Sequence, residues 1–150
     1  MKIVYLSAIA YDDLKQRPQY MAEKLSEKNE VIYIEPTIRW ISCVLGRATE
    51  YKRYLRQVSE NLTVVRCNGL FVLPFRWKPY DFMKLGNIAE RVQLKKYLSS
   101  ADVIIVGYEG WTDVVQSVKN AKIVYDKMDD NVLLTNEISS VSYTHLRAHE

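Results

Sequence analysis

The stretch that decides the fold is Lys2-Ile3-Val4-Tyr5-Leu6-Ser7, a short apolar run at the start of the chain. Runs rich in Val, Ile and Tyr, with little polar alternation, are typical of strands covered on both faces. Four later segments share this character, and we predict strands there as well: 30–35, 62–67, 102–107 and 122–126.

The segments between these strands carry apolar residues at helical spacing. One stripe follows the first strand: Pro18, Met21, Ala22 and Leu25. A longer helix with Asp81 as its N-cap has a mostly shared apolar face: Phe82, Leu85, Ile88, Ala89, Val92 and Leu98. A shorter one carries Val114, Val115 and Val118. Helices between buried strands predict an α/β fold with a Rossmann-like parallel sheet, for which we expect the strand order 3-2-1-4-5.

Four residues just past the first strand, Gln16-Arg17-Pro18-Gln19, mark the start of a helix. Proline suits the first helical turn because its missing N–H would have no intrahelical partner there. Arg17 should therefore lie near free backbone donors, at a place that favours an anionic group. The alternative is that Arg17 pairs with Asp12 or Asp13 and only shapes the loop.

Polar side chains follow several of the predicted strands. In a doubly wound sheet, ligands bind outside the carboxyl ends of the strands, so these residues should share one rim. The set comprises Asp12, Asp13, Gln16, Arg17, Glu35, Glu109, Asp126, Asp129 and Asp130. Acids at strand ends also serve as helix caps or hydrate loops, and that alternative stays open for each of them.

Several classes of site are disfavoured by what the sequence lacks. After the first strand comes Ser7-Ala8-Ile9-Ala10, without the glycines that a dinucleotide fingerprint or a P-loop needs. Both histidines lie at the extreme end of the chain, so no imidazole base or histidine-based metal site is expected. Cys43 and Cys67 are too few for a zinc cluster and are predicted to be reduced thiols.

Two separated segments resemble the N-terminal part of bacterial glycosyltransferases of the GT-B fold. The match is to the branch that builds cell-wall and capsular polysaccharides, including teichuronic-acid-type enzymes. The first segment runs from Tyr11 to Tyr20 and is followed by a strand that ends in Glu35-Pro36. The second is Val124-Tyr125-Asp126-Lys127-Met128-Asp129-Asp130, a strand that ends in Tyr-Asp and soon reaches a double acid.

The resemblance implies transfer of a sugar from a sugar nucleotide to a glycan or lipid-linked acceptor. The rim would hold the acceptor through Asp12, Gln16, Arg17, Glu109 and Asp126. Asp13, Asp129 and Asp130 are candidates for the catalytic carboxylate, with Asp12 a further candidate base, if the reaction inverts configuration. The donor would bind in a C-terminal domain that is missing from this chain, so we expect no cofactor and no metal here.

The last ten residues, 141–150, look like no protein segment. They resemble the translation of a transposase-type sequencing-library adapter, and we exclude them from the fold. The domain is therefore expected to span 1–140 and to be an incomplete, inactive fragment with an exposed apolar sheet edge.

The stretch 39–78 is the least regular and combines basic with aromatic residues. Such a surface could lie on anionic lipid headgroups; alternatively, its apolar residues pack and its charges are solvated. The net charge of +3 does not indicate nucleic-acid binding. No secretory signal is recognised and no apolar run is long enough to span a bilayer, which favours a cytoplasmic protein, peripheral at most on the inner membrane face.

Two other classes of function remain open from the sequence. One is a non-enzymatic doubly wound binding or receiver-like module, in which the acids would surround a metal or a phosphorylation site. Against it, Asp12-Asp13 lies a few residues too far beyond the first strand. The other class is a membrane-peripheral interaction domain without chemistry.

Overall fold

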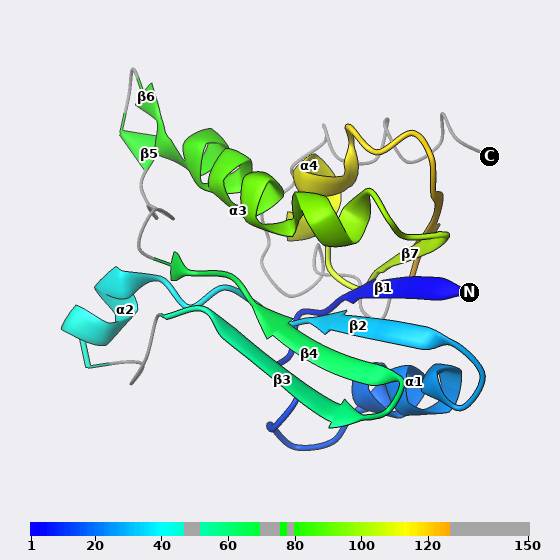
Figure 1. The fold of residues 1–150 in the computed structure, drawn as a ribbon. Coiled ribbons are helices and arrows are strands. Elements are labelled where there is room, and N and C mark those ends of the chain that lie inside the picture. The colour runs from blue at the N-terminus through cyan, green and yellow to red at the C-terminus, as the bar shows by residue number, and fades with distance from the viewer. Residues whose placement is uncertain (47–51, 70–75, 78–79, 127–150) are drawn as a thin grey trace.

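A computed structural model of the chain describes residues 1–46, 52–69, 76–77 and 80–126. Its centre is a six-stranded sheet with the order β3-β4-β2-β1-β7-β8 (Figure 1). The strands are β1 (Lys2–Leu6), β2 (Glu30–Ile34), β3 (Tyr54–Ser59), β4 (Leu62–Arg66), β7 (Val103–Val106) and β8 (Lys122–Tyr125). Five of them fall at the places that the buried apolar runs predict.

The five predicted strands pair in parallel, as expected, but the sheet as a whole is mixed because it has a sixth strand. Strand β3, inside the stretch read as irregular, pairs antiparallel with β4, whereas the other four pairings are parallel. Tyr54 and Arg56 are half-buried in β3 and its other residues are exposed. A search for continuous apolar runs misses such a strand, because only one of its faces is covered.

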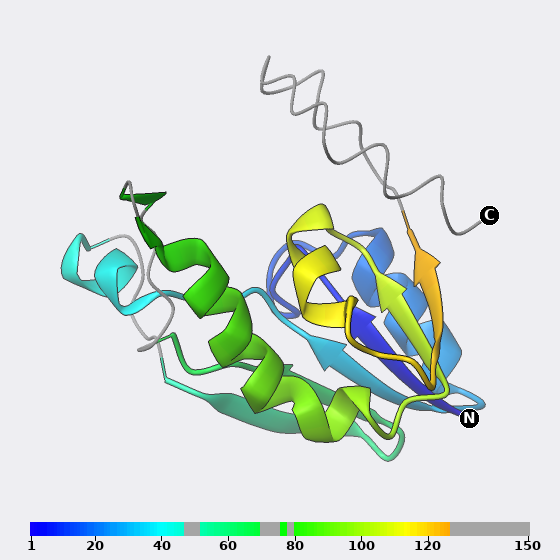
Figure 2. The same cartoon turned by 90° about the horizontal axis from the view of Figure 1, so that it is seen from above.

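Helices cover both faces of this sheet, as Figure 2 shows. Helix α1 (Arg17–Ser26) lies on one face, while α3 (Phe82–Leu98) and α4 (Thr112–Val115) lie on the other. A 3-10 turn, η2 (Glu109–Trp111), leads into α4, and the short helix α2 (Trp40–Val44) follows β2. Strands β5 (Arg76–Trp77) and β6 (Tyr80–Asp81) form a separate two-stranded hairpin.

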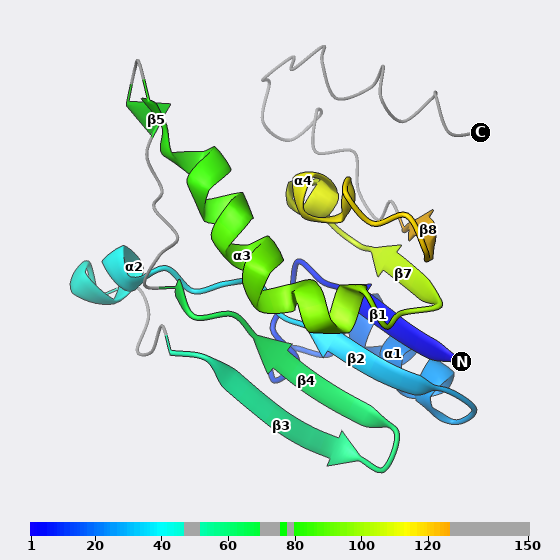
Figure 3. The same ribbon diagram turned by 45° about the horizontal axis from the view of Figure 1, so that its top comes forward.

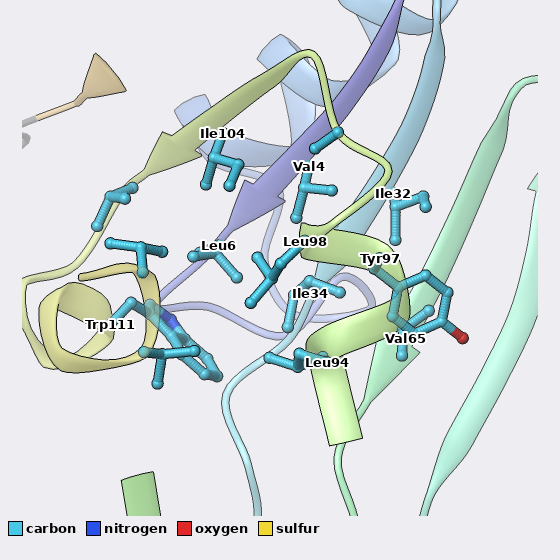
Figure 4. Packing of buried hydrophobic residues seen from close by; sticks show 14 of the residues in the cluster. Val4, Leu6, Ile32, Ile34, Val65, Leu94, Tyr97, Leu98, Ile104 and Trp111 are labelled. Atoms are coloured by element: carbon cyan, nitrogen blue, oxygen red, sulfur yellow. The ribbon is translucent and has the colours of Figure 1, made fainter. Parts of the chain in front are cut away.

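Each face of the sheet has its own apolar core. The larger core packs α3 and α4 on the sheet through residues such as Leu6, Ile34, Leu94, Leu98 and Trp111 (Figure 4). The smaller one joins α1 to the other face, where alternate residues of the same strands, among them Tyr5 and Tyr33, are fully buried. Burial on both faces explains why these strands read as unbroken apolar runs.

Helix α3 buries only part of the predicted stripe: Leu98 is buried as predicted, but Ile88 and Val92 are not. Ile88 and Val92 are 51% and 68% exposed, whereas Leu94, Tyr97 and Leu98 are buried against the sheet. Both stripes have helical spacing, so periodicity alone could not decide which one faces the core. Asp81 ends β6 and directly precedes α3, at the predicted N-cap position, but its side chain lies outside the part described. The side chains of 82–85 lie outside the part described.

Several predictions fall on residues that the structure does not describe. The double acid Asp129-Asp130, the tail 141–150 and the basic-aromatic residues of 70–75 lie outside the described ranges. In the described part, Val124 and Tyr125 of the edge strand β8 are 39% and 42% exposed.

Candidate functional site

The carboxyl edge of the parallel strands is built as one continuous rim. Beyond β1, β2, β7 and β8 the hydrogen-bond ladder of the sheet continues by one further bond: the N–H groups of Ser7, Glu35, Gly107 and Asp126 donate to carbonyls of neighbouring strands at 2.9 Å. These four residues are therefore held in register. The sequence prediction that several polar segments converge here is supported for Glu35 and Asp126.

The loop from β1 to α1 crosses this rim and is fixed by Gln19, which is 1% exposed. Its side-chain amide donates to the Ala10 carbonyl at 3.1 Å, and its side-chain oxygen accepts the backbone N–H of Gln16 at 3.0 Å. Gln16 is the N-cap of α1, and Pro18 lies in the first turn, as predicted. Gln19 thus sets the position from which Arg17 extends.

Arg17 forms an ion pair with Asp126, the first residue after β8. Nη2 of Arg17 lies 2.6 Å from Oδ1 of Asp126, and the Tyr5 hydroxyl donates to Oδ2 at 2.9 Å. The Arg17 side chain is 59% exposed, whereas that of Asp126 is only 8% exposed. The alternative in which Arg17 pairs with Asp12 or Asp13 is therefore wrong.

The surroundings of Asp126 favour a positioning role over proton transfer. Both of its carboxylate oxygens are engaged, one by Arg17 and the other by Tyr5. Burial, and next the hydrogen bond to Asp126, raise the pKa of Tyr5, so that its hydroxyl stays protonated and donates. The exposed guanidinium has five N–H donors, and among the described residues Asp126 is its one ion-pair partner.

Asp12 takes part in a different ion pair. Nη2 of Arg56, on β3, lies 2.5 Å from Oδ1 of Asp12, and this hydrogen bond raises the pKa of Arg56. Arg17 and Asp12 thus pair with residues at opposite edges of the sheet, β8 and β3. The structure does not bring Asp12 to Arg17, although Asp12 lies in the loop that leads to this first residue of α1.

Glu35 lies on the rim but is a structural residue. Its carboxylate is 1% exposed and accepts from both Nε and Nη2 of Arg66, at 2.9 and 2.6 Å. The other oxygen accepts the Tyr11 N–H at 2.7 Å. The Glu35–Arg66 pair therefore fixes the loop over β2.

A cluster of tyrosines beneath the loop was not recognised from the sequence. The rings of Tyr5 and Tyr33 stack with centroids 5.7 Å apart, and Tyr11 meets Tyr33 edge-on at 5.3 Å. Burial raises the pKa of Tyr33 to about 12, and burial with a bond to Glu23 does the same for Tyr11. A signal was available, because Tyr5 and Tyr33 hold equivalent positions in adjacent predicted strands.

The remaining predicted residues are distributed as follows. Asp13, Gln16 and Glu109 are exposed, the last on the turn η2 after β7. Asp129 and Asp130 lie outside the described residues. Within the described ranges, no three His, Cys, Asp or Glu residues are grouped so that they could hold a metal ion, and none of the helices there is long and apolar enough to cross a bilayer.

Comparison with known proteins adds no assignment. No family model matches the chain, and no curated protein matches it either. The site therefore has to be interpreted from its own geometry.

Proposed function

We propose that this chain is the acceptor-side part of a glycosyltransferase that moves a sugar from a sugar nucleotide to a glycan or lipid-linked acceptor. One observation carries the proposal. The two sequence segments that resemble this class meet at the rim, through the 2.6 Å contact between Arg17 and Asp126. Contact between the two segments is what a shared site at the rim requires.

Arg17 would bind an anionic group of the acceptor, such as a phosphate or a carboxylate. Charge-assisted hydrogen bonds from a guanidinium to such groups are among the stronger polar contacts in proteins. Asp126 would hold the guanidinium in place, since Asp126 is buried and its oxygens are occupied. Gln16 and Glu109, both exposed near the same edge, would contact the sugar hydroxyls.

Proton transfer would fall to a carboxylate other than that of Asp126, whose two oxygens are occupied. In an inverting reaction, Asp13, Asp129 or Asp130 would accept the proton of the attacking hydroxyl, as general-base catalysis requires. In a retaining reaction the same acids would orient the acceptor. The sugar-nucleotide donor would bind in a further domain outside these 150 residues.

The receiver-like alternative is less well supported. It needs unpaired carboxylates beside the end of β1, whereas Asp12 pairs with Arg56 on the edge strand β3.

The test is a transfer assay on the protein expressed from its complete gene, with labelled sugar nucleotides and lipid-linked or soluble glycan acceptors. We expect transfer, and a fall of roughly 10–100-fold in kcat/KM for Arg17→Ala, equivalent to about 1.4–2.8 kcal/mol. Lys15→Ala is the matched control, because Lys15 is an exposed cation of the same loop that pairs with Glu23 instead. Absence of transfer with every donor, or equal losses in the two variants, would contradict the proposal.

A further inference from the structure

A second cationic surface lies on the opposite face of the sheet, between α3 and the start of β3. It is a depression of about 530 Å³ that is open to solvent and is lined by Arg53, Val92, Gln93, Lys95, Lys96 and Ser99. Figure 3 shows how α3 runs over the sheet, with β3 at its outer edge. Among the described lining residues there are three cations and no acid.

Tyr97 organises two of these cations. Nη2 of Arg53 donates to the Tyr97 hydroxyl at 3.2 Å, and Nζ of Lys96 lies 4.5 Å from the centroid of the Tyr97 ring. Tyr97 itself is only 8% exposed, so its position is fixed by the core. Residues from two elements far apart in the chain are thus brought to one place.

The three cations have no acidic partner among the described residues. None of Arg53, Lys95 and Lys96 belongs to the ion pairs found there, whereas Arg56 and Arg66 are paired with Asp12 and Glu35. Like charges that are gathered without a counter-charge repel one another, and an anionic partner relieves that repulsion.

Exposed apolar side chains adjoin the cations on the outer face of α3. Val92 lines the depression and is 68% exposed, and Ile88, one turn earlier, is 51% exposed. Such a combination suits the boundary between headgroups and acyl chains, where basic residues meet phosphates and apolar residues leave water. It suits a nucleic acid less, because the aromatic ring present, Tyr97, is buried and cannot stack on a base.

We propose that the outer face of α3, with Arg53 just before β3, docks on the surface of an anionic phospholipid bilayer. Arg53, Lys95 and Lys96 would contact lipid phosphates while Ile88 and Val92 enter the headgroup boundary. Of the stretch 39–78 considered from the sequence, Arg53 contributes, whereas Arg56 and Arg66 pair with acids of this chain. This inference does not depend on the proposed sugar transfer.

Sedimentation of the chain with vesicles tests the proposal. We expect binding to phosphatidylcholine vesicles that contain phosphatidylglycerol, weaker binding at high salt, and none to phosphatidylcholine alone. Lys95→Ala/Lys96→Ala should lower the partition coefficient roughly 30-fold, from about 1 kcal/mol per basic residue. Lys24→Ala/Lys28→Ala is the charge-matched control, because both lysines are exposed at the α1 side of the sheet; it should bind like the wild type.

The apolar contribution is tested by Ile88→Ser/Val92→Ser, which leaves the charge unchanged and should weaken vesicle binding several-fold. Circular dichroism of each variant checks that its fold is retained. The proposal is overturned if anionic vesicles do not bind at low salt, or if both lysine pairs cause the same loss. A further result would also overturn it: Ile88→Ser/Val92→Ser binds anionic vesicles as well as the wild type does, and single-stranded RNA displaces the protein from them. That result would identify a surface that binds any polyanion.

Discussion

At the residue scale, the candidate site depends on Asp126, whose carboxylate joins Tyr5 below it to Arg17 above it. Asp126→Ala leaves the buried Tyr5 hydroxyl without its acceptor and removes the partner of Arg17. An unsatisfied buried donor costs about 1–3 kcal/mol, so we expect the free energy of unfolding to fall by that amount. Urea unfolding, monitored by circular dichroism, measures it.

Two further variants show whether the loss arises from the Tyr5–Asp126 bond. Glu109→Ala removes an exposed acid near the same edge and should change the stability by less than about 0.5 kcal/mol. Tyr5→Phe should cost less when Asp126 is already alanine, because the orphaned hydroxyl is then removed. Equal effects of Asp126→Ala and Glu109→Ala would show that the bond contributes nothing.

Glu90 provides a pH-dependent prediction. It is a residue of α3 that is 9% exposed, and burial raises the pKa of its carboxyl group above the usual value. Because the pKa of Glu90 is higher in the folded state, its carboxyl group contributes fully to the free energy of unfolding only below its unfolded pKa of about 4.3. That contribution is lost as the pH rises and the group ionises. Glu90→Gln should therefore gain stability relative to the wild type between about pH 4 and pH 7.

The measurement is the urea midpoint of both proteins across that pH range. Only the difference between them matters, since all other titrating groups are shared. A difference that stays constant with pH would contradict the predicted ionisation behaviour of Glu90.

At the scale of elements, the buried side chain of Gln19 fixes the loop that leads into α1. Gln19→Ala removes the bonds from its side chain to Ala10 and Gln16 and leaves the loop less constrained. We expect a loss of about 1–3 kcal/mol in the free energy of unfolding. Gln116→Ala, at the exposed end of α4, is the control and should be close to neutral. Similar losses of stability in Gln19→Ala and Gln116→Ala would contradict the role of Gln19 in fixing the loop before α1.

Helix α3 offers a direct comparison between its two apolar stripes. Leu94 is 1% exposed in the larger core, whereas Val92 is 68% exposed. Leu94→Ala should cost about 2–5 kcal/mol, because it removes core packing and leaves a cavity. Val92→Ala should change stability by less than about 0.5 kcal/mol. A reversed order in thermal or urea unfolding would mean that the helix packs with its other face.

The buried strands could be predicted because both of their faces are covered, so that each is a short, continuous apolar run in the sequence. Runs of that length are more typical of buried strands than of helices. Strand β3 could not be, since it has only Tyr54 and Arg56 half-buried. The burial of Leu94 instead of Val92 depends on the angle at which α3 crosses the sheet, and local spacing contains no such information.

The candidate site shows a similar division. The rim itself follows from the topology, because parallel strands end at the same edge. Which acid meets which arginine does not follow, and Arg17 pairs with Asp126 while Asp12 pairs with Arg56. These choices depend on the path of the loop from β1 to α1, which is set by tertiary bonds such as those of Gln19.

At the scale of the whole molecule, the two proposed surfaces lie on different parts of the sheet. The Arg17 site is at the carboxyl edge beside α1, and the cationic depression is on the opposite layer, formed by α3 and β3. Vesicle binding and acceptor binding should consequently be separable by mutation.

The central claim is that Arg17, held by Asp126, binds the anionic group of an acceptor. The most direct test is an NMR titration of the isotope-labelled chain with an acidic oligosaccharide and with its neutral counterpart. We predict shifts of the Arg17 side-chain N–H and of the Asp126 backbone with the acidic glycan only. These shifts should be abolished in Arg17→Gln and retained in Lys15→Gln. Undiminished binding by Arg17→Gln, or no binding of the acidic glycan at all, would contradict the claim.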